Sequence, residues 1–280
     1  MNSKLGDLKI RQAILRMAPY LPPLESRDPE KHLLMDFNES PVPPPAEAIA
    51  AISDFLSRRA NVYPAYHDFL KVLSGYTGVE EDQLLLSNGS DHGIELVLRC
   101  FLEKGDELVM ALPGFAMFEQ VASTLGARVT GPRYSENMEF PAEALHQAVH
   151  DKTRLMVLIN PNNPTGTTIS PDAIKNFLES FPDLPILVDE AYFEFSGQTA
   201  AGLLGDFSNL IILRTFSKAL ALPSLRLGYV MAHPELIKQL AKIRGPFDIN
   251  SAAVVAAKVQ LENPEGWQSL TRHLMDEVKP

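Results

Sequence analysis

The sequence is poor in cysteine and in long apolar stretches. Its single cysteine, Cys100, excludes an internal disulfide bond and lies in an apolar helical pattern, which favours a buried thiol in a reducing compartment. No window approaches the roughly 18 uncharged apolar residues of a membrane span. Residues 1–7 lead into no apolar signal segment. We therefore expect a soluble, cytoplasmic protein with no membrane partner.

Clusters of basic residues are also missing. The 25 lysines and arginines stand against 35 aspartates and glutamates, a formal net charge of −10 at pH 7, so no nucleic-acid partner is expected. There is no G-x-G-x-x-G segment opening a helix and no Walker A sequence, which argues against dinucleotide and NTP binding. His146 and His150 are spaced like two metal ligands, but no third ligand accompanies them. A solvated helix face is therefore favoured over a metal site.

Proline, by contrast, is frequent in the first 45 residues. A long helix or a central strand is excluded there, so residues 1–45 are predicted to form an extended arm across a surface. The segment Leu33–Phe37 gives this arm apolar side chains to bury. The prolines are Pro19, Pro22, Pro23, Pro29, Pro41, Pro43, Pro44 and Pro45.

Short apolar runs alternate with helical patterns from residue 46 to about residue 245. Alternation of this kind predicts an α/β fold, with a largely parallel sheet covered by helices on both faces. The predicted strands are 83–86, 107–111, 127–130, 155–159, 186–188, 210–213 and 227–231. One predicted helix begins near 46, a second is carried by Phe69, Val72 and Leu73, and the others cover 91–102, 115–125, 141–149, 171–181, 234–243 and 251–261.

Four polar loops follow predicted strands, where open α/β sheets bind their ligands. In the first, Ser87–Gly93, either Ser90 or Asp91 can cap the next helix and leave N–H groups free for an anion. An ordinary helix cap is the alternative. In the second, Asn160–Gly166, two Asn-Pro steps favour a rigid turn at the end of a strand, with a structural turn as the alternative.

The other two loops carry ionisable groups. Asp189 ends a buried strand and needs a cationic partner there, because an unpaired buried charge is costly. In the last loop Lys218 can act as an amine nucleophile if it is shielded from water, whereas a solvated loop lysine is the alternative. Thr215, Ser217 and Arg226 around it can bind a phosphate.

Together the loops offer an amine, a carboxylate, an aromatic hydroxyl, an amide and an anion site. Pyridoxal 5′-phosphate requires this set, since its aldehyde needs a lysine and its ring nitrogen needs a carboxylate. Phe115 can stack on the ring, with core packing as the alternative.

These spaced motifs resemble those of the class I/II aminotransferases of PLP fold type I, and among them the histidinol-phosphate aminotransferases. The resemblance runs from about Tyr20 to residue 260. It implies a seven-stranded, mostly parallel sheet with Lys218 as the Schiff-base lysine and proton carrier. It further implies that Asp189 pairs with the pyridine nitrogen, and that Asn163 and Tyr192 hold the ring hydroxyl oxygen.

The resemblance also implies the remaining contacts of the site. Tyr63 would reach the phosphate of the neighbouring subunit's cofactor, which makes a homodimer the active unit. Tyr20 and Asn38 would lie near the substrate. The phosphate-binding residues would be Ser90, Asp91, Ser217 and Arg226, assisted by Thr215.

The sequence departs from the family at several points. Phe115 stands where the family usually has tyrosine, and Gly114 where it usually has threonine. Large-domain features cover residues 46–245, so 246–280 would be only the beginning of the C-terminal small domain, whose arginine grips the substrate carboxylate. Arg244 and Arg272 are not at the matching place.

The expected function is a PLP-dependent aminotransferase of amino-acid biosynthesis. It would move an amino group between an amino donor and a 2-oxo acid or a phosphorylated keto compound. One alternative is a decarboxylase or lyase resembling threonine-phosphate decarboxylase, which the cofactor residues do not separate because substrate contacts select the bond that breaks. The other alternative is a non-catalytic PLP-binding module.

Overall fold

The computed structural model describes residues 8–22, 24, 27–28 and 30–277. The predictions for residues 1–7, for Pro23 and Pro29 in the arm, and for the last three residues lie outside this part of the chain.

The described residues form seven strands and the helices around them. The strands are β1 (Leu84–Ser87), β2 (Glu107–Met110), β3 (Arg128–Thr130), β4 (Thr153–Ile159), β5 (Ile186–Asp189), β6 (Leu210–Thr215) and β7 (Gly228–Ala232). The α-helices are α1 (Gln12–Leu15), α2 (Ala46–Arg59), α3 (His67–Thr77), α4 (Gly89–Phe101), α5 (Met117–Leu125), α6 (Ala142–Gln147), α7 (Pro171–Ser180), α8 (Phe193–Ser196), α9 (Pro234–Ile243), α10 (Ser251–Glu262) and α11 (Glu265–Glu277). Short 3-10 helices are η2 (Glu81–Gln83), η3 (Ala201–Leu203) and η4 (Pro223–Leu225).

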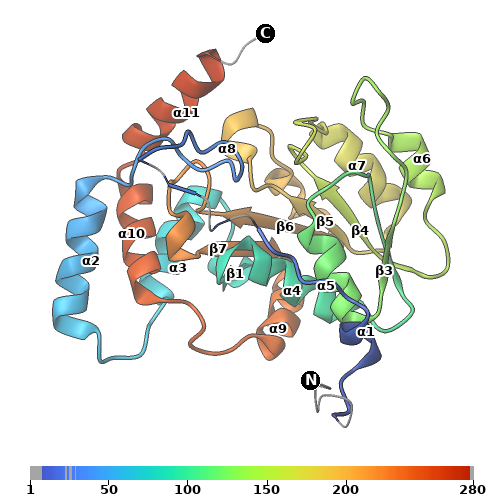
Figure 1. Ribbon diagram of the computed structural model, residues 1–280, viewed down its shortest axis with the longest axis horizontal. Helices are drawn as coiled ribbons and strands as arrows, with labels where there is room; N and C mark the ends of the chain where they lie inside the picture. The colour runs from blue at the N-terminus through green and yellow to red at the C-terminus, as the bar shows by residue number, and fades with distance from the viewer. Residues whose placement is uncertain (1–7, 23, 25–26, 29, 278–280) are drawn as a thin grey trace.

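The strands join in one central sheet in the order β1-β7-β6-β5-β4-β2-β3 (Figure 1). Strands β3, β2, β4, β5 and β6 pair in parallel, while β7 pairs antiparallel with both β6 and β1. All strands except β7 therefore point the same way. The predicted α/β fold with a mostly parallel seven-stranded sheet is confirmed.

Side chains alternate between the two faces of the sheet, and both faces are buried under helices. In β5, Leu187 belongs to the core that α4, α5 and α9 cover, whereas Ile186 and Val188 belong to the core beneath α3, α7 and α10. Parallel strands buried on both faces need apolar residues at nearly every position. This requirement explains why continuous apolar runs marked the strands in the sequence.

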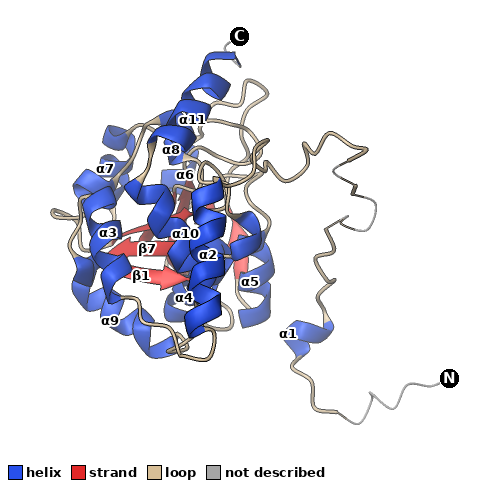
Figure 2. Ribbon diagram, turned by 90° about the vertical axis from the view of Figure 1, so that its left-hand side faces the viewer, coloured by secondary structure: helices blue, strands red, loops and turns tan. Residues whose placement is uncertain are grey.

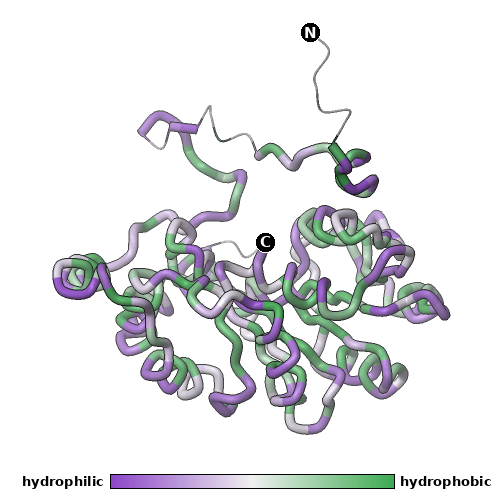
Figure 3. Tube along the Cα trace, turned by 90° about the horizontal axis from the view of Figure 1, so that it is seen from below, coloured by the Kyte–Doolittle hydropathy of each residue, from purple (hydrophilic) through white to green (hydrophobic). Residues whose placement is uncertain are grey.

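The N-terminal arm runs beside the body of the molecule (Figures 2 and 3). Helix α1 is held against α5, where the Arg11 guanidinium donates a hydrogen bond to the Thr124 carbonyl (2.7 Å). The expectation that Leu33–Phe37 buries its apolar side chains is wrong for Leu33 and Met35, whereas Leu34 and Phe37 are half-buried. Leu33 is 85% exposed and Met35 is 76% exposed, because this part of the arm lies outside the helical layers.

The last two helices pack on the body from one side. Helix α10, predicted over 251–261, contributes Ala253, Ala256 and Ala257 to the core shared with α2 and α3. Helix α11 was not predicted because its apolar residues are sparse among polar ones. It is anchored by Trp267, whose indole N–H donates to the Gln260 carbonyl at 3.0 Å. The predicted domain boundary at residue 245 falls between α9 and α10 and stays a prediction.

None of the helices in the described residues has the length and apolar character to cross a membrane.

Gly228 marks a close approach of backbones beside the first polar loop. A Cβ atom at this position would lie 2.8 Å from the Gly89 carbonyl carbon and the Ser90 nitrogen, and 2.9 Å from the Arg214 carbonyl oxygen. We expect Gly228→Ala to lower the free energy of unfolding by about 1–3 kcal/mol, since backbone atoms cannot rotate away. Urea denaturation measures this. In Gly202→Ala, where nothing lies within 4 Å, the change should stay within about 0.5 kcal/mol; equal effects would contradict the tight packing.

Candidate active site

The four polar loops meet at one edge of the sheet. β1 ends at Ser87, β4 at Ile159, β5 at Asp189 and β6 at Thr215, and these parallel strands all end on the same side. The loops enclose a cavity of about 540 Å³, which we call the Asp189 cavity. A site at the carboxyl ends of the strands is the usual place for ligands in this class of fold.

Every predicted site residue except Tyr63 lines the Asp189 cavity. These residues are Tyr20, Asn38, Ser90, Asp91, Phe115, Asn163, Asp189, Tyr192, Thr215, Ser217, Lys218 and Arg226. Phe115 lies in the loop before α5, which begins at Met117 rather than at the predicted residue 115.

Tyr63 lies elsewhere. It is 75% exposed and stacks on Phe247, with a distance of 4.4 Å between ring centroids. Its contact with a partner's cofactor stays a prediction.

Asp189 is almost completely buried at the end of β5, with 3% of its surface exposed. Its carboxylate accepts a hydrogen bond from the Ala191 N–H (3.1 Å). Burial raises the pKa of Asp189 to about 7; the carboxylates of Asp91 and Glu190 also raise it, and Lys218 lowers it. Among the described residues no lysine or arginine forms a salt bridge with Asp189, so the predicted cationic partner is not a side chain of this part of the chain.

Lys218 is shielded rather than solvated. Its ammonium donates a hydrogen bond to the Phe37 carbonyl (2.6 Å) and lies 5.5 Å from the centroid of the Tyr192 ring. Burial, helped by the Arg226 charge, lowers the pKa of Lys218 against the opposing influence of nearby carboxylates. The amine therefore loses its proton more easily than a surface lysine, as a nucleophile requires.

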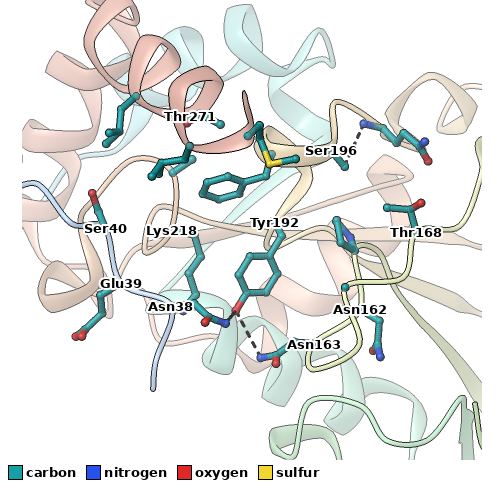
Figure 4. Close-up of a pocket in the computed structure, with 18 of the residues that line it drawn as sticks. Asn38, Glu39, Ser40, Asn162, Asn163, Thr168, Tyr192, Ser196, Lys218 and Thr271 are labelled. Atoms are coloured by element: carbon teal, nitrogen blue, oxygen red, sulfur yellow. Dashed lines mark hydrogen bonds between the residues drawn. The ribbon is translucent and has the colours of Figure 1, made fainter. Parts of the chain in front are cut away.

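Two amides converge on the Tyr192 hydroxyl (Figure 4). Asn38 from the N-terminal arm donates to it at 3.0 Å, and Asn163 from the loop after β4 donates at 3.5 Å. Burial raises the pKa of Tyr192, so the hydroxyl keeps its proton and can donate it to a ligand oxygen. Asn163 is aimed by its neighbour Asn162, whose amide donates to the Pro113 carbonyl (3.1 Å) and to Thr165 Oγ1 (2.9 Å).

An anion-binding end forms where Arg226 meets the start of α4. The Arg226 guanidinium contacts Asp91 Oδ2 at 3.0 Å and Ser217 Oγ at 3.5 Å. A Cβ atom at Gly89 would lie 2.9 Å from the guanidinium carbon, and the φ of +76° at this position favours glycine. The expectation that Ser90 or Asp91 caps the helix is wrong, because α4 begins at Gly89 and both lie in its first turn. Their N–H groups have no partner earlier in the helix and can face an anion.

One buried ion pair was missed by the sequence analysis. Arg214 on β6 is 3% exposed, Glu190 directly after β5 is fully buried, and their charged groups lie 2.8 Å apart. An arginine within the apolar run 211–214 and a glutamate next to Asp189 were signals that could have found it.

A second cavity of about 570 Å³ also has Tyr192 in its wall (Figure 4). Its outer wall comes from α11, with Leu270, Leu274 and Met275, and we call it the α11 cavity. The two cavities share the lining residues Asn38, Glu39, Asn163, Pro164, Tyr192 and Lys218. Arg244 and Arg272 line neither cavity. The α11 cavity was not predicted because the helix was not.

The other candidate groups lie away from this edge. His150 Nε2 contacts Glu107 Oε2 at 3.0 Å at the opposite end of β2, and no group of three possible metal ligands occurs in the described residues. Cys100 is half-buried in α4, and burial raises the pKa of its thiol.

The Asp189 cavity fits pyridoxal 5′-phosphate at both ends. The buried acid without a side-chain counter-charge suits a protonated ring nitrogen, and the cradle of Gly89 and Arg226 suits a phosphate. Lys218 and Tyr192 lie between, where an aldehyde and a ring oxygen would be. The fold and the cavity together define a PLP-dependent transferase.

The chain belongs to the class I and II aminotransferase family, whose cofactor is pyridoxal 5′-phosphate. The model of this family, "Aminotransferase class I and II", matches residues 30–278. The predicted family, fold class and cofactor are confirmed, while the roles of single residues stay predictions.

Several known proteins are similar to it. A histidinol-phosphate aminotransferase from Roseiflexus castenholzii is 36% identical over 91% of this chain and 72% of its own length. A dihydroxyacetone phosphate transaminase from Campylobacter jejuni is 32% identical over 97% of this chain and 75% of its own length. The crystal structure of histidinol-phosphate aminotransferase from Sinorhizobium meliloti with pyridoxal-5′-phosphate superposes with a TM-score of 0.80, at 26% identity over 86% of this chain and 67% of that one.

The raised pKa of Asp189 has a consequence for stability. Below about pH 3, the carboxyl is largely protonated in both states. As pH rises from 3.8 towards 7, the unfolded chain releases this proton first, which favours unfolding, and above 7 the cost is constant. We therefore expect cofactor-free Asp189→Asn to lie within about 1 kcal/mol of the wild type near pH 4 and to exceed its free energy of unfolding by about 2–4 kcal/mol at pH 8.

Urea unfolding at pH 4, 6 and 8 measures this difference. Asp206→Asn, at an exposed position, is the matched control and should track the wild type throughout. A difference for Asp189→Asn that does not grow with pH would contradict the buried carboxyl.

Proposed function

We propose that this chain is a PLP-dependent aminotransferase that moves an amino group between an amino donor and a 2-oxo acid or phosphorylated keto compound, by a ping-pong mechanism. The observation that carries the proposal is the convergence of Lys218, Asp189 and Tyr192 on one cavity with an anion-binding end. A phosphorylated substrate is favoured because the relatives from Roseiflexus and Campylobacter carry the names of two different phosphorylated compounds.

The cofactor supplies an aldehyde that condenses with amines and a ring that withdraws electrons from the bonds at the substrate Cα. Asp189 holds the ring nitrogen in its protonated form. Its raised pKa in the free cavity falls once a positive charge is placed against it. Tyr192 and Asn163 hold the ring oxygen, and Phe115 covers a face of the ring.

Lys218 carries the amine and the proton. Its lowered pKa makes the neutral amine accessible, and the Phe37 carbonyl orients the nitrogen beside Tyr192. In its neutral form the Lys218 amine would be able to take the proton from the substrate Cα and to return it to the carbon two bonds away. Arg226, Ser217 and the N–H groups at the start of α4 fix the phosphate, which keeps the ring in register with Lys218.

We expect wild-type protein mixed with pyridoxal 5′-phosphate to gain the visible absorbance band of lysine-bound cofactor, and Lys218→Ala to lack it, because no amine remains at that position. Transfer of amino groups should fall by at least about a thousandfold. Retention of the band in Lys218→Ala would sink the assignment. Lys152→Ala, at an exposed position, should keep both band and activity.

Analysis of products separates the competing functions in the same experiment. A keto product with pyridoxamine phosphate supports transfer. Release of CO₂ from an amino acid supports a decarboxylase, and a cofactor that no added amine converts supports a binding module.

The active unit in this proposal is a homodimer in which Tyr63 reaches the partner's phosphate. Exposed apolar side chains lie on α2 and in the turn that leads to Tyr63: Ile49, Leu56 and Val62. Large apolar groups left exposed together are typical of a surface that a partner covers.

We expect Tyr63→Phe to weaken pyridoxal phosphate binding about 10- to 100-fold, through loss of a hydrogen bond to a charged group. Hybrid dimers of Tyr63→Phe with Lys218→Ala should recover activity at limiting cofactor, because each hybrid contains one site with both native residues. No recovery on mixing, with hybrid formation verified by size and mass, would contradict a contact across the interface.

A further inference from the structure

A buried ion pair lies directly behind Asp189, outside the cavity wall. The Arg214 Nε donates to Glu190 Oε2 at 2.9 Å, and Glu190 also accepts hydrogen bonds from Thr199 Oγ1 (2.8 Å) and the Ala200 N–H (2.6 Å). Two charges removed from water are costly unless hydrogen bonds satisfy them, as they do here. Neither Glu190 nor Arg214 lines either cavity, so the pair acts on a ligand only through other residues.

The pair fixes the segment that carries Tyr192. Arg214 lies over the Phe193 ring, 3.5 Å from its centroid, and donates to Thr199 Oγ1 at 2.6 Å. One side chain of β6 thus holds residues 190, 193 and 199, and Tyr192 lies between the first two. The position of a tyrosine hydroxyl that contacts a ligand depends on packing and hydrogen bonds that hold the neighbouring residues in place.

The pair also balances charge beside Asp189. Glu190 is the next residue in the chain, and its carboxylate contributes to the raised pKa of Asp189. Without Arg214, that carboxylate would act at full strength in a buried setting, and Asp189 would hold its proton more tightly.

Other titratable groups face the guanidinium but do not replace Glu190. Burial raises the pKa of Glu194 on α8 to about 8, and Tyr76 on α3 donates a hydrogen bond to it at 3.3 Å. Burial also raises the pKa values of Tyr76 and of Tyr229 on β7. All three groups are largely neutral at pH 7, so Glu190 is the anion that neutralises Arg214.

We propose that Glu190 and Arg214 form a positioning pair for the cofactor ring, which holds Tyr192 in place and keeps the charge of Glu190 from opposing the ionisation of Asp189. This inference rests on the proposed function, since it requires that Asp189 receive the ring nitrogen.

The test compares Arg214→Met, Glu190→Gln and the double variant Glu190→Gln/Arg214→Met. The Kd for pyridoxal 5′-phosphate is measured by absorbance titration of the full chain between pH 5.5 and 9. The midpoint, the pH at which the change in Kd is half complete, reports ionisation of Asp189. Arg214→Met leaves the negative charge of Glu190 unbalanced, so it should raise the midpoint by about one pH unit. Glu190→Gln leaves the positive charge of Arg214 unbalanced, so it should lower the midpoint. The double variant should return to the wild-type midpoint.

Affinity gives a second readout. Arg214→Met should weaken binding by at least about tenfold at pH 7.5, and the double variant should recover part of that loss. Glu107→Gln is the matched control, since Glu107 is a nearly buried carboxylate at the opposite end of the sheet; it should leave midpoint and Kd unchanged. Arg214→Lys keeps the charge but cannot reach all three partners, so it should keep the midpoint and weaken binding.

Shifts of the midpoint in the same direction for both single variants, or a double variant no better than Arg214→Met, would overturn the proposal. If Arg214→Met does not fold, two variants still test the proposal. Glu190→Gln should lower the midpoint, and Arg214→Lys should keep the midpoint and weaken binding. Failure of the proposed function looks different: the wild type itself would bind no cofactor, or would bind it equally well without Lys218.

Discussion

Asp189 is buried at the end of a central strand, and no lysine or arginine of the described chain forms a salt bridge with it. Burying a carboxylate is costly. The Ala191 N–H donates a hydrogen bond to the Asp189 carboxylate, and burial raises the pKa of Asp189 towards neutrality. The neighbouring Glu190 receives the arginine instead. This division leaves a place for one positive charge, which a protonated pyridine ring would supply in the proposed function. The rest of the cavity is arranged around that charge.

Topology gathers the remaining groups. Five strands run parallel, β1 points the same way, and the loops after β1, β4, β5 and β6 therefore meet at one edge. Close backbone contact allows the loops to share one cavity: Gly228 lets β7 approach the start of α4, and Gly89 makes room for Arg226. Rigid elements hold each side chain from behind, which suits a site where small displacements cost much of the rate.

The N-terminal arm completes the wall of the Asp189 cavity, although it is far from the other lining residues in the sequence. Phe37 and Asn38 contact Lys218 and Tyr192 across 181 and 154 residues of sequence. The arm lies largely outside the helical layers, yet these two contacts orient the amine and the phenol. Residues outside the hydrophobic core can therefore still orient the side chains of the candidate active site.

The sequence by itself determined the strands, the loops that follow them and half of the residues that line the Asp189 cavity, because buried parallel strands leave apolar runs that are visible locally. Lys218, Asp189 and Asn163 each stand at the end of such a run or a few residues beyond it. Only the tertiary structure decided that Arg214 pairs with Glu190, that Tyr63 lies outside the cavity, that Ser90 does not cap its helix, and that α11 closes a second cavity. The physical reason is that periodicity is local, whereas these contacts depend on the spatial order of strands and on helix packing, which no local pattern contains.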